Sequence, residues 1–398
     1  MIPFAKPDIT TQEATAAGKT LLSSWLTGGP VVNQFASKVA EFCSADRAVC
    51  YDSCTAALEM SLRALGIGKG DEVITSPYTY SATAEVIRNV GARIVFCDLK
   101  PGTFEMNYDI LPDLIRPNTK AVIPVDIGGK PCNYYALSTA ISSKASLFYP
   151  STPLQKSIGR VAVVADAAHS FGASRGNWKT GAIADFTCFS FHVLKSITTG
   201  GEGGAVVWRE FDGIDNDRLA DELALLGDHG QTTKERTGEK GRAWEYDIAL
   251  FGFNHIMTDV DAAVGLVQLD RFGEVMEKRE ALTKEYYRLL PGCVEPGIYH
   301  FGDGFTSSMH LFPVHIPGAN EEERNRVFAE LLDAGICCNV HYKPLPMFTA
   351  YIRAGFDIRD YPVAYDTFKN LITLPYHTGM TADDVVRVCE TIERVIRK

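Results

Sequence analysis

The chain has 398 residues, of which 46% are hydrophobic and 22% are charged, a composition typical of a globular protein long enough to bury two domains. A formal net charge of -10 and an isoelectric point near 5.5 argue against nucleic-acid binding, which usually needs a basic surface, and favour small-molecule partners. No apolar run reaches the roughly 20 residues that span a bilayer, and the first residues lack a signal-peptide pattern, so we expect a cytoplasmic protein.

The ten cysteines are scattered along the chain, without a CxxC pair or a dense disulfide framework. Most are therefore expected to be reduced residues of the core.

Short β-branched runs alternate with helical segments from about residue 48 to residue 207. The strand-like runs are RAVCYD (47–52), DEVITS (71–76), RIVFCDL (93–99), KAVIPVD (120–126), VAVVADAA (161–168), DFTCFSF (185–191) and GAVVW (204–208). CTAALEMSLRALGI and YSATAEVIRNVGA are typical helical segments between them. This alternation predicts an α/β architecture in which helices cover a mostly parallel sheet. Ligands of such sheets gather at the loops that follow the carboxyl ends of strands.

The second half of the chain has a different pattern. The polar segment 228–247 predicts a long mobile loop, and the apolar spacing over 259–290 predicts one long helix. That helix leads into a part that resembles a compact α+β unit. We therefore predict a large domain over residues 1–270 and a small domain over residues 271–398.

The first candidate site residues along the chain are Ser53, Cys54 and Thr55, directly before a predicted helix. Amides at a helix N-terminus, together with hydroxyl groups, form a phosphate site, although neither a Walker lysine nor a GxGxxG motif is present. Ordinary capping of the helix by Ser53 or Thr55 explains these residues almost as well. Tyr80 follows the next strand and could stack on a cofactor ring, while a core or rim position is more common for a single tyrosine.

A second candidate is Asp166, at the end of an apolar run and followed by two alanines and His169. A carboxylate at a strand end could keep a heteroaromatic nitrogen protonated, as pyridoxal phosphate requires. Capping of the following turn by Asp166 is at least as common. A metal site at Asp166 and His169 is disfavoured, because no further ligands follow at metal spacing.

Lys195 stands between the run DFTCFSF and the glycine-dense stretch TTGGEGG. A lysine amine becomes a nucleophile when burial or charge lowers its pKa, and it then forms an imine with a carbonyl such as an aldehyde cofactor. A single lysine is far more often a solvated surface residue. Together, however, Lys195, Asp166, the Ser53–Thr55 turn and Tyr80 supply the contacts that pyridoxal phosphate needs.

Four segments in order, SCTAALEMSLRALGIGKGDEVITSPYTYSATAEVI, VADAAHSFGA, FSFHVLKSITTGGEGGAVV and FGFNHIMTDVDAAVGLVQLDR, resemble the DegT/DnrJ/EryC1/StrS family of pyridoxal-phosphate-dependent sugar aminotransferases. The resemblance covers nearly the whole chain and implies the aspartate-aminotransferase-like fold of type I. It implies that Lys195 holds the cofactor as an imine, that Asp166 pairs with the pyridine nitrogen, and that His169 lies near the phenolic oxygen.

The resemblance also implies roles for other residues. Phosphate contacts are expected from Cys54, Thr55 and Ser190, ring stacking from Tyr80, and a further phosphate contact from Asn254 of a neighbouring subunit, in a homodimer with shared active sites. Expected near the substrate are His192, which is also close to the cofactor, and His341, Tyr342 and Lys343. The chain departs from the family pattern in three places: Ser196 replaces the usual asparagine, TTGGEGG is one glycine longer, and Asp126 replaces a frequent histidine.

The presence of Lys195 favours amino transfer, because the sugar 3-dehydratases of this family have histidine there. The implied reaction is a ping-pong transfer from glutamate, which leaves as 2-oxoglutarate, to a nucleotide-linked keto sugar. We expect UDP-4-keto-6-deoxy-N-acetylhexosamine, aminated at C4 for surface polysaccharide or glycan synthesis. A 3-keto dTDP sugar, a 4-keto GDP sugar and a dehydratase reaction remain alternatives. A non-catalytic regulator is disfavoured, because no DNA-binding segment is appended.

Overall fold

The centre of the molecule, in a computed structural model that describes residues 1–232 and 245–397, is a seven-stranded sheet with the order β1-β9-β8-β5-β4-β2-β3. Its strands are β1 (Arg47–Tyr51), β2 (Glu72–Thr75), β3 (Arg93–Phe96), β4 (Thr119–Ile123), β5 (Ala162–Asp166), β8 (Phe186–Ser190) and β9 (Gly204–Trp208). Strand β9 pairs antiparallel with β1 and β8, and the other pairs are parallel. The predicted mostly parallel sheet is confirmed.

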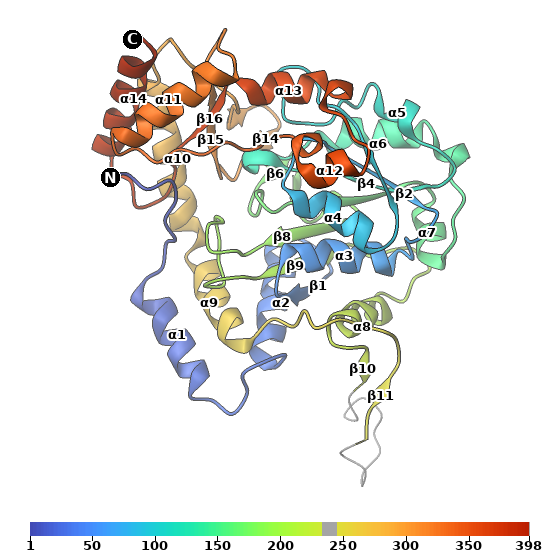
Figure 1. The fold of residues 1–398 in the computed structure, drawn as a ribbon. Helices are drawn as coiled ribbons and strands as arrows, with labels where there is room; N and C mark the ends of the chain where they lie inside the picture. The colour runs from blue at the N-terminus through green and yellow to red at the C-terminus, as the bar shows by residue number, and fades with distance from the viewer. Residues whose placement is uncertain (233–244, 398) are drawn as a thin grey trace.

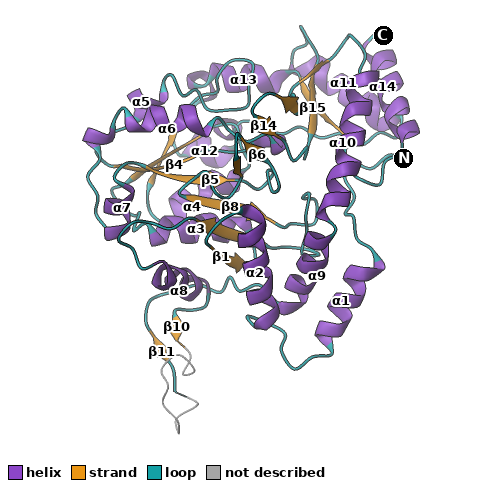
Figure 2. Cartoon of the chain, turned by 180° about the vertical axis from the view of Figure 1, so that it is seen from behind, coloured by secondary structure: helices purple, strands orange, loops and turns teal. Residues whose placement is uncertain are grey.

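Helices cover both faces of this sheet (Figures 1 and 2). They include α2 (Pro30–Cys43), α3 (Cys54–Ala64), α4 (Ser81–Asn89), α5 (Leu111–Leu114), α6 (Tyr134–Ser142), α7 (Pro153–Ile158) and α8 (Asn216–Gly227). Successive residues of a strand point to opposite faces. On β8, Phe186 and Cys188 accordingly pack in the core with α3, whereas Phe189 packs in the core with α2. Burial on both faces explains the continuous apolar runs of these strands.

The predicted single helix over 259–290 is wrong: α9 (Asp259–Asp270) and α10 (Phe272–Leu289) are separate helices. Between them, Arg271 has a ψ of 4°, outside the helical range. The buried guanidinium of Arg271 forms ion pairs, each at 2.7 Å, with Asp8 and with Glu13 of α1 (Thr11–Leu21). These contacts to the start of the chain hold the side chain at the break between the two helices.

The C-terminal part contains a three-stranded sheet with the order β12-β15-β16. Its strands are β12 (Glu295–Pro296), β15 (Phe312–His315) and β16 (Leu371–Leu374), and the helices of this part after α10 are α11 (Glu321–Asp333), α12 (Thr349–Arg353), α13 (Pro362–Lys369) and α14 (Ala382–Ile396). This part has its own apolar core, which also takes in Ile2, and both chain ends lie beside it (Figure 1).

The two parts of the chain also contact each other. A four-stranded sheet with the order β13-β14-β6-β7 combines β6 (Ser174–Arg175) and β7 (Trp178–Lys179) with β13 (Phe301–Gly302) and β14 (Phe305–Thr306). The division into domains at residue 270 stays a prediction, because this sheet crosses it.

The predicted mobile loop over 228–247 begins and ends in a small ribbon, in which β10 (Gln231–Thr232) pairs antiparallel with β11 (Asp247–Ile248). The middle of that predicted loop, residues 233–244, lies outside the described residues. None of the helices in the described part of the chain is long and apolar enough to cross a membrane.

Candidate active site

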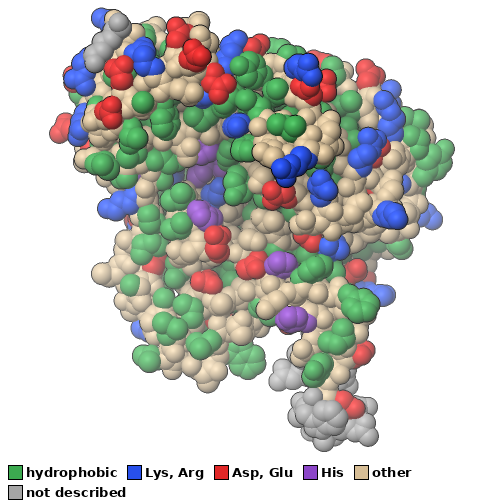
Figure 3. Space-filling view, viewed as in Figure 1, with side chains coloured by type: hydrophobic (Ala, Val, Ile, Leu, Met, Phe, Trp, Pro, Cys, Tyr) green, Lys and Arg blue, Asp and Glu red, His purple; other side chains and the backbone are tan. Residues whose placement is uncertain are grey.

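A cavity of about 1030 Å³ opens at the carboxyl ends of β5 and β8, between the central sheet and the C-terminal part. On the face shown in Figure 3, histidine side chains gather at a hollow in the middle of the molecule. All the predicted site residues except Asn254 line the cavity, namely Ser53, Cys54, Thr55, Tyr80, Asp166, His169, Ser190, His192, Lys195, His341, Tyr342 and Lys343. Residues from distant parts of the chain therefore meet at one site, at the sheet edge that the strand pattern indicates.

Asn254 lies apart from this cavity. It is exposed and forms a β-bridge with Asp228. Its predicted contact with the site of a neighbouring subunit stays a prediction.

The Ser53–Thr55 turn forms the N-terminus of α3. Ser53 is the N-cap residue, and its Oγ accepts a hydrogen bond from Ala56 N at 3.2 Å, so the capping alternative holds for this hydroxyl. Gly204 of β9 packs against the turn: a Cβ there would lie 2.3 Å from the Ser53 carbonyl carbon and 2.4 Å from Cys54 N. The close approach of β9 therefore requires glycine at position 204.

The positions of the glycines in TTGGEGG differ in whether the structure requires glycine there. Gly200 has a φ of +109°, which favours glycine, and a Cβ at Gly203 would lie 2.2 Å from Thr199 Oγ1. Gly201 has neither restriction, because a Cβ there would meet nothing within 4 Å. Glu202, which lies between Gly201 and Gly203 in the sequence, lines the cavity.

Asp166, at the end of β5, is only 6% exposed. Its Oδ2 accepts a hydrogen bond from Thr83 Oγ1 at 2.7 Å, and its Oδ1 accepts one from Ala168 N at 3.2 Å. Burial raises the pKa of Asp166. The two hydrogen bonds and the charge of Lys195 lower this pKa, but their combined effect is smaller than that of burial. A buried carboxyl that is bonded to neutral groups would gain most from a cationic ligand.

Lys195 lies in the turn after β8, where its N–H donates to the His192 carbonyl at 2.9 Å. Burial lowers the pKa of its amine, while the nearby Asp166, Cys54 and Glu202 act in the opposite direction. A lowered pKa increases the neutral, nucleophilic fraction of a lysine. Lys195 lines the cavity and is therefore not an ordinary solvated surface lysine.

His169 is held as a neutral imidazole of defined tautomer. Gly128 N–H donates to its Nδ1 at 3.1 Å, so the ring proton is on Nε2, which lies 3.2 Å from Tyr342 Oη. Burial lowers the pKa of His169 well below its ordinary value, and the charge of Lys195 adds to this effect. The Nε2–H of His169 therefore donates to Tyr342 Oη, which belongs to another residue of the cavity lining.

His192 is oriented by its own turn. Its Nδ1 accepts from Leu194 N at 3.3 Å, and its Nε2 lies 3.8 Å from Glu202 Oε1. His192, which is predicted to lie near the cofactor and substrate, therefore faces the carboxylate of Glu202 on the glycine-rich loop.

Aromatic rings and one lysine line the mouth of the cavity. Tyr80 is 64% exposed, with its ring centroid 6.3 Å from that of Tyr342. The Nζ of the exposed Lys343 lies 4.9 Å from the ring centroid of Phe348. Deeper in, His341 Nδ1 lies 3.1 Å from Thr373 Oγ1, and burial lowers the pKa of His341 to about 3.

Several lining residues were missed by reasoning from the sequence. They are Phe4, whose ring centroid lies 5.4 Å from that of His341, Glu202, His310 and Phe348. Thr83, which holds Asp166, was missed as well. The polar residues at positions 202 and 310, in otherwise apolar or glycine-rich surroundings, were available signals, whereas nothing in the sequence places Phe4.

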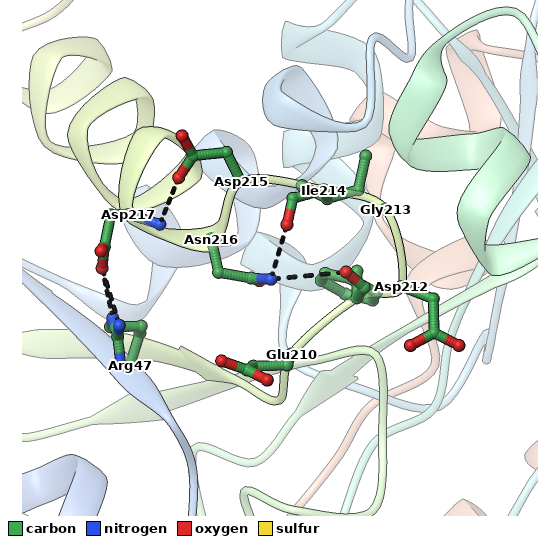
Figure 4. A pocket seen from close by; sticks show the side chains of 9 residues that line it. Arg47, Glu210, Asp212, Gly213, Ile214, Asp215, Asn216 and Asp217 are labelled. Atoms are coloured by element: carbon green, nitrogen blue, oxygen red, sulfur yellow. Dashed lines mark hydrogen bonds and ion pairs between the residues drawn. The ribbon is translucent and has the colours of Figure 1, made fainter.

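A second cavity, of about 290 Å³, lies at the turn between β9 and α8 (Figure 4). Two of its polar side chains are paired within the fold: Arg47 Nη2 lies 2.7 Å from Asp217 Oδ1, and Asn216 Nδ2 donates to the Ile214 carbonyl at 3.1 Å. This cavity contains neither lysine nor histidine. Over residues 1–232 and 245–397, no group of three or more His, Cys, Asp or Glu side chains could hold a metal ion.

Comparisons with known proteins show which family the chain is similar to. The model of the DegT/DnrJ/EryC1/StrS aminotransferase family matches residues 7–393. The spore coat polysaccharide biosynthesis protein SpsC of Bacillus subtilis is 32% identical, over 100% of this chain and 97% of the relative. The UDP-4-amino-4,6-dideoxy-N-acetyl-beta-L-altrosamine transaminase of Campylobacter jejuni is 30% identical, over 100% and 98% of the two chains.

The solved structures of Spr1654, a proposed sugar aminotransferase of Streptococcus pneumoniae, share 41% identity with this chain. The PMP-form has a TM-score of 0.97 over 100% of this chain and 99% of that one, and the PLP-form has a TM-score of 0.95 over 100% and 98%. Helicobacter pylori PseC, an aminotransferase of pseudoaminic acid biosynthesis, has a TM-score of 0.86 at 25% identity, over 100% and 99% of the two chains.

Proposed function

The chain belongs to the DegT/DnrJ/EryC1/StrS aminotransferase family and is a pyridoxal-phosphate-dependent sugar aminotransferase of fold type I; on this premise we propose that it transfers the amino group of glutamate to a nucleotide-linked keto sugar. The proposed acceptor is UDP-4-keto-6-deoxy-N-acetylhexosamine, aminated at C4 for surface polysaccharide or glycan synthesis. The names of two relatives support this choice: a transaminase of a UDP-linked 4-amino-4,6-dideoxy sugar and a protein of spore coat polysaccharide biosynthesis.

The cavity residues fit pyridoxal phosphate. The N-terminus of α3 at Ser53–Thr55 and the hydroxyl of Ser190 are suited to its phosphate, because amides at a helix start favour an anion. Asp166 offers a buried carboxyl without a cationic hydrogen-bond partner among the described residues. Tyr80 offers an exposed ring at the mouth for stacking, and His169, whose Nε2–H meets Tyr342 Oη, would lie near the phenolic oxygen.

When bound, pyridoxal phosphate supplies an electron sink for the carbanion at the reacting carbon. Asp166 would hold a proton on the pyridine nitrogen, and its burial strengthens that hydrogen bond, because its side-chain hydrogen-bond partners Thr83 and Ala168 are neutral. Lys195 would bind the cofactor, and its Nζ would act as the base that takes a proton from the reacting carbon of the amino donor and, in the sugar half, as the acid that delivers a proton to the reacting carbon of the sugar. The lowered pKa of Lys195 favours the neutral amine that this role needs.

The residues towards the mouth hold the substrate. His192 lies beside the reacting groups, and its ring is set by Leu194 N–H and Glu202. His341 and Tyr342 contact the sugar, and Lys343 contacts the nucleotide diphosphate, because it is the cation at the exposed end of the cavity.

Two copies of the chain form a cytoplasmic homodimer in which Asn254 reaches the phosphate site of the partner. Exposed apolar side chains support this arrangement. Phe251, three residues before Asn254, is 97% exposed, and Leu22 and Trp25 are exposed as well. A surface that buries Phe251 against a second copy would bring Asn254 to the same interface.

The observation that carries this proposal is the meeting of Lys195 and Asp166, each with a pKa shifted by burial, in one large cavity. It is tested by incubating the purified protein with glutamate and a panel of UDP-, dTDP- and GDP-linked 3-keto and 4-keto sugars. Cofactor absorbance and sugar mass are followed.

Gain of one amine by the UDP-linked 4-keto sugar supports the proposal. Amination of another sugar corrects the substrate. Loss of water without gain of an amine would replace the proposal by a dehydratase.

A further inference from the structure

His310 is a cavity residue that the reaction described above does not use. It is 6% exposed, as deeply buried as Asp166 and His169, and it lines the cavity. Its ring centroid lies 4.4 Å from that of His169. The Nδ1 atom of His310 is buried and has no hydrogen-bond partner among the described residues. A buried polar atom without a partner is unfavourable, so its retention at a cavity wall points to a ligand.

The backbone before His310 is held in an unfavourable conformation. Met309 has a φ of +50°, in the left-handed region that is unfavourable for a residue with a side chain. Buried Arg279 secures this turn, because its Nη1 donates to the Met309 carbonyl at 3.0 Å. Strain that the surroundings enforce in this way is typical of residues positioned for a ligand.

The charge state of His310 limits what it can bind. Burial, together with the neighbouring His169 and Lys195, lowers its pKa well below the ordinary value of 6.5. The ring is therefore neutral, with one N–H donor and one acceptor nitrogen. A half turn about the Cβ–Cγ bond exchanges Nδ1 with Cδ2, so a ring nitrogen can be presented to the cavity without moving the ring plane.

A hydroxyl group suits this imidazole better than a carboxylate does. A hydroxyl both donates and accepts, so it pairs with either tautomer, whereas a carboxylate only accepts and loses much of its hydration when it meets an uncharged partner. Of the two proposed substrates, the ring of the keto sugar keeps a hydroxyl at C3, and the amino donor carries carboxylates. The nucleotide belongs at the exposed mouth near Lys343, which leaves the sugar ring at the depth of His310.

We propose that His310 hydrogen-bonds a hydroxyl of the keto sugar and is a substrate-binding residue of the sugar half of the reaction. This inference rests on the proposed function. It predicts that His310 contributes to sugar binding and not to the glutamate half.

The test compares His310→Phe, which keeps a ring without polar atoms, with His310→Asn, which keeps a polar atom near Nδ1. Each is loaded with pyridoxamine phosphate or pyridoxal phosphate, and the two half-reactions are followed separately by cofactor absorbance. Calorimetry with UDP-N-acetylglucosamine, which has no keto group, measures sugar binding without turnover.

We expect His310→Phe to weaken sugar binding and the sugar half-reaction by about 10- to 100-fold, the loss that a missing hydrogen bond in a buried site gives. We expect His310→Asn to retain part of the affinity and both variants to keep the glutamate half-reaction. His300→Gln is the matched control: His300 is also buried, but its Nδ1 bonds Ser307 Oγ and its Nε2 bonds the Leu311 carbonyl, each at 2.8 Å. This control should alter thermal stability and leave sugar binding unchanged.

Unchanged sugar binding in His310→Phe would overturn the inference, as would equal losses in both half-reactions or a loss confined to the glutamate half. If wild-type protein aminates no nucleotide sugar, the proposed function itself fails. If it aminates one and His310→Phe binds that sugar normally, only the inference about His310 fails. Near-ultraviolet circular dichroism of each variant establishes that it is folded.

Discussion

Two of the buried carboxylates, Glu13 and Asp166, lie in opposite surroundings. Glu13, where α1 meets α9, accepts hydrogen bonds from Arg271 Nη1 at 2.7 Å and from Gln268 Nε2 at 2.8 Å. Burial alone would raise its pKa, yet the hydrogen bonds from Thr10 and Arg271 lower the pKa of Glu13 to about 2. Asp166, in the cavity, is bonded to the neutral groups of Thr83 and Ala168, and burial raises its pKa.

This difference separates a structural acid from one that is prepared for a ligand. The fold supplies a guanidinium to Glu13 and leaves Asp166 without a cation among its hydrogen-bond partners. The same contrast applies to His300, whose ring nitrogens are both bonded, and His310, whose Nδ1 is not. Burial with complete pairing indicates a stabilising role, and burial beside a cavity with incomplete pairing indicates a binding role.

The largest expected effect is at the cavity. Lys195→Ala removes the amine that moves the proton, and we expect transamination to fall by about 1,000-fold or more. Lys343→Ala, at the mouth, is the matched control and should retain most of the turnover number at saturating sugar. The mass of the sugar product measures both. Full transamination by Lys195→Ala would contradict the role of this lysine.

A steric change near the phosphate turn gives the next largest effect. In Gly204→Ala the new methyl group would overlap the backbone of Ser53 and Cys54, so the start of α3 must shift. We expect cofactor affinity to fall by about 100-fold, measured by titrating the apoprotein with pyridoxal phosphate. Gly201→Ala adds the same methyl group where nothing lies within 4 Å and should bind as wild type does. If the two variants bound pyridoxal phosphate with equal affinity, the Ser53–Thr55 turn would not be part of the phosphate site.

The two carboxylates should respond oppositely to neutralisation. Glu13→Gln removes the charge that pairs with Arg271, and we expect the free energy of unfolding at pH 7 to fall by about 3 kcal/mol. Asp166→Asn should leave the stability of the apoprotein unchanged or raised, because a buried carboxylate with a raised pKa is unfavourable, while transamination falls by about 100-fold. Denaturant unfolding measures the stabilities, and equal destabilisation of both variants would break the comparison.

The lowered pKa of Glu13 predicts how the loss of stability in Glu13→Gln depends on pH. A folded-state pKa below the ordinary value of 4.5 means that the charge of Glu13 stabilises the protein fully above pH 4.5 and less as the pH falls towards about 2. The stability difference between wild type and Glu13→Gln should therefore shrink over that range. A difference that is constant from pH 7 to pH 3 would show that lost packing, not lost charge, explains it.

The smallest expected effect is at the mouth. Lys343→Gln removes an exposed cation, and we expect the KM for the nucleotide sugar to rise by about 10-fold with little change in the glutamate half-reaction, an effect that weakens with added salt. Steady-state kinetics at two ionic strengths measure it. Arg353→Gln, a change of charge on α12 outside the cavity lining, is the control.

Local pattern predicted the central sheet and the first site candidates, and the family resemblance added Ser190, His192, Asn254 and residues 341–343. The strand ends at Asp166 and Ser190, and the helix start at Cys54, depend on nearby sequence, and parallel strands bring such ends to one edge of a sheet. The break at Arg271 depends on Asp8 and Glu13, which are more than 250 residues away in the sequence, so helical spacing alone predicts one helix there.

The residues that were missed depend on tertiary contacts in the same way. His310 owes its place to the strained turn at Met309 and to the guanidinium of Arg279, and Thr83 is recognised only once α4 lies beside β5. Phe4 meets His341 across almost the whole chain length. The role of Asn254 depends on a second copy and cannot be assigned from one chain.

The most direct test of the account is to find which lysine binds the cofactor. The holoprotein is treated with borohydride, which fixes the bound cofactor, and is digested for peptide mass analysis. We predict the mass of one reduced pyridoxal phosphate on the peptide that contains Lys195, and no addition elsewhere. Attachment at another lysine, or no attachment to a protein that retains activity, would contradict the account.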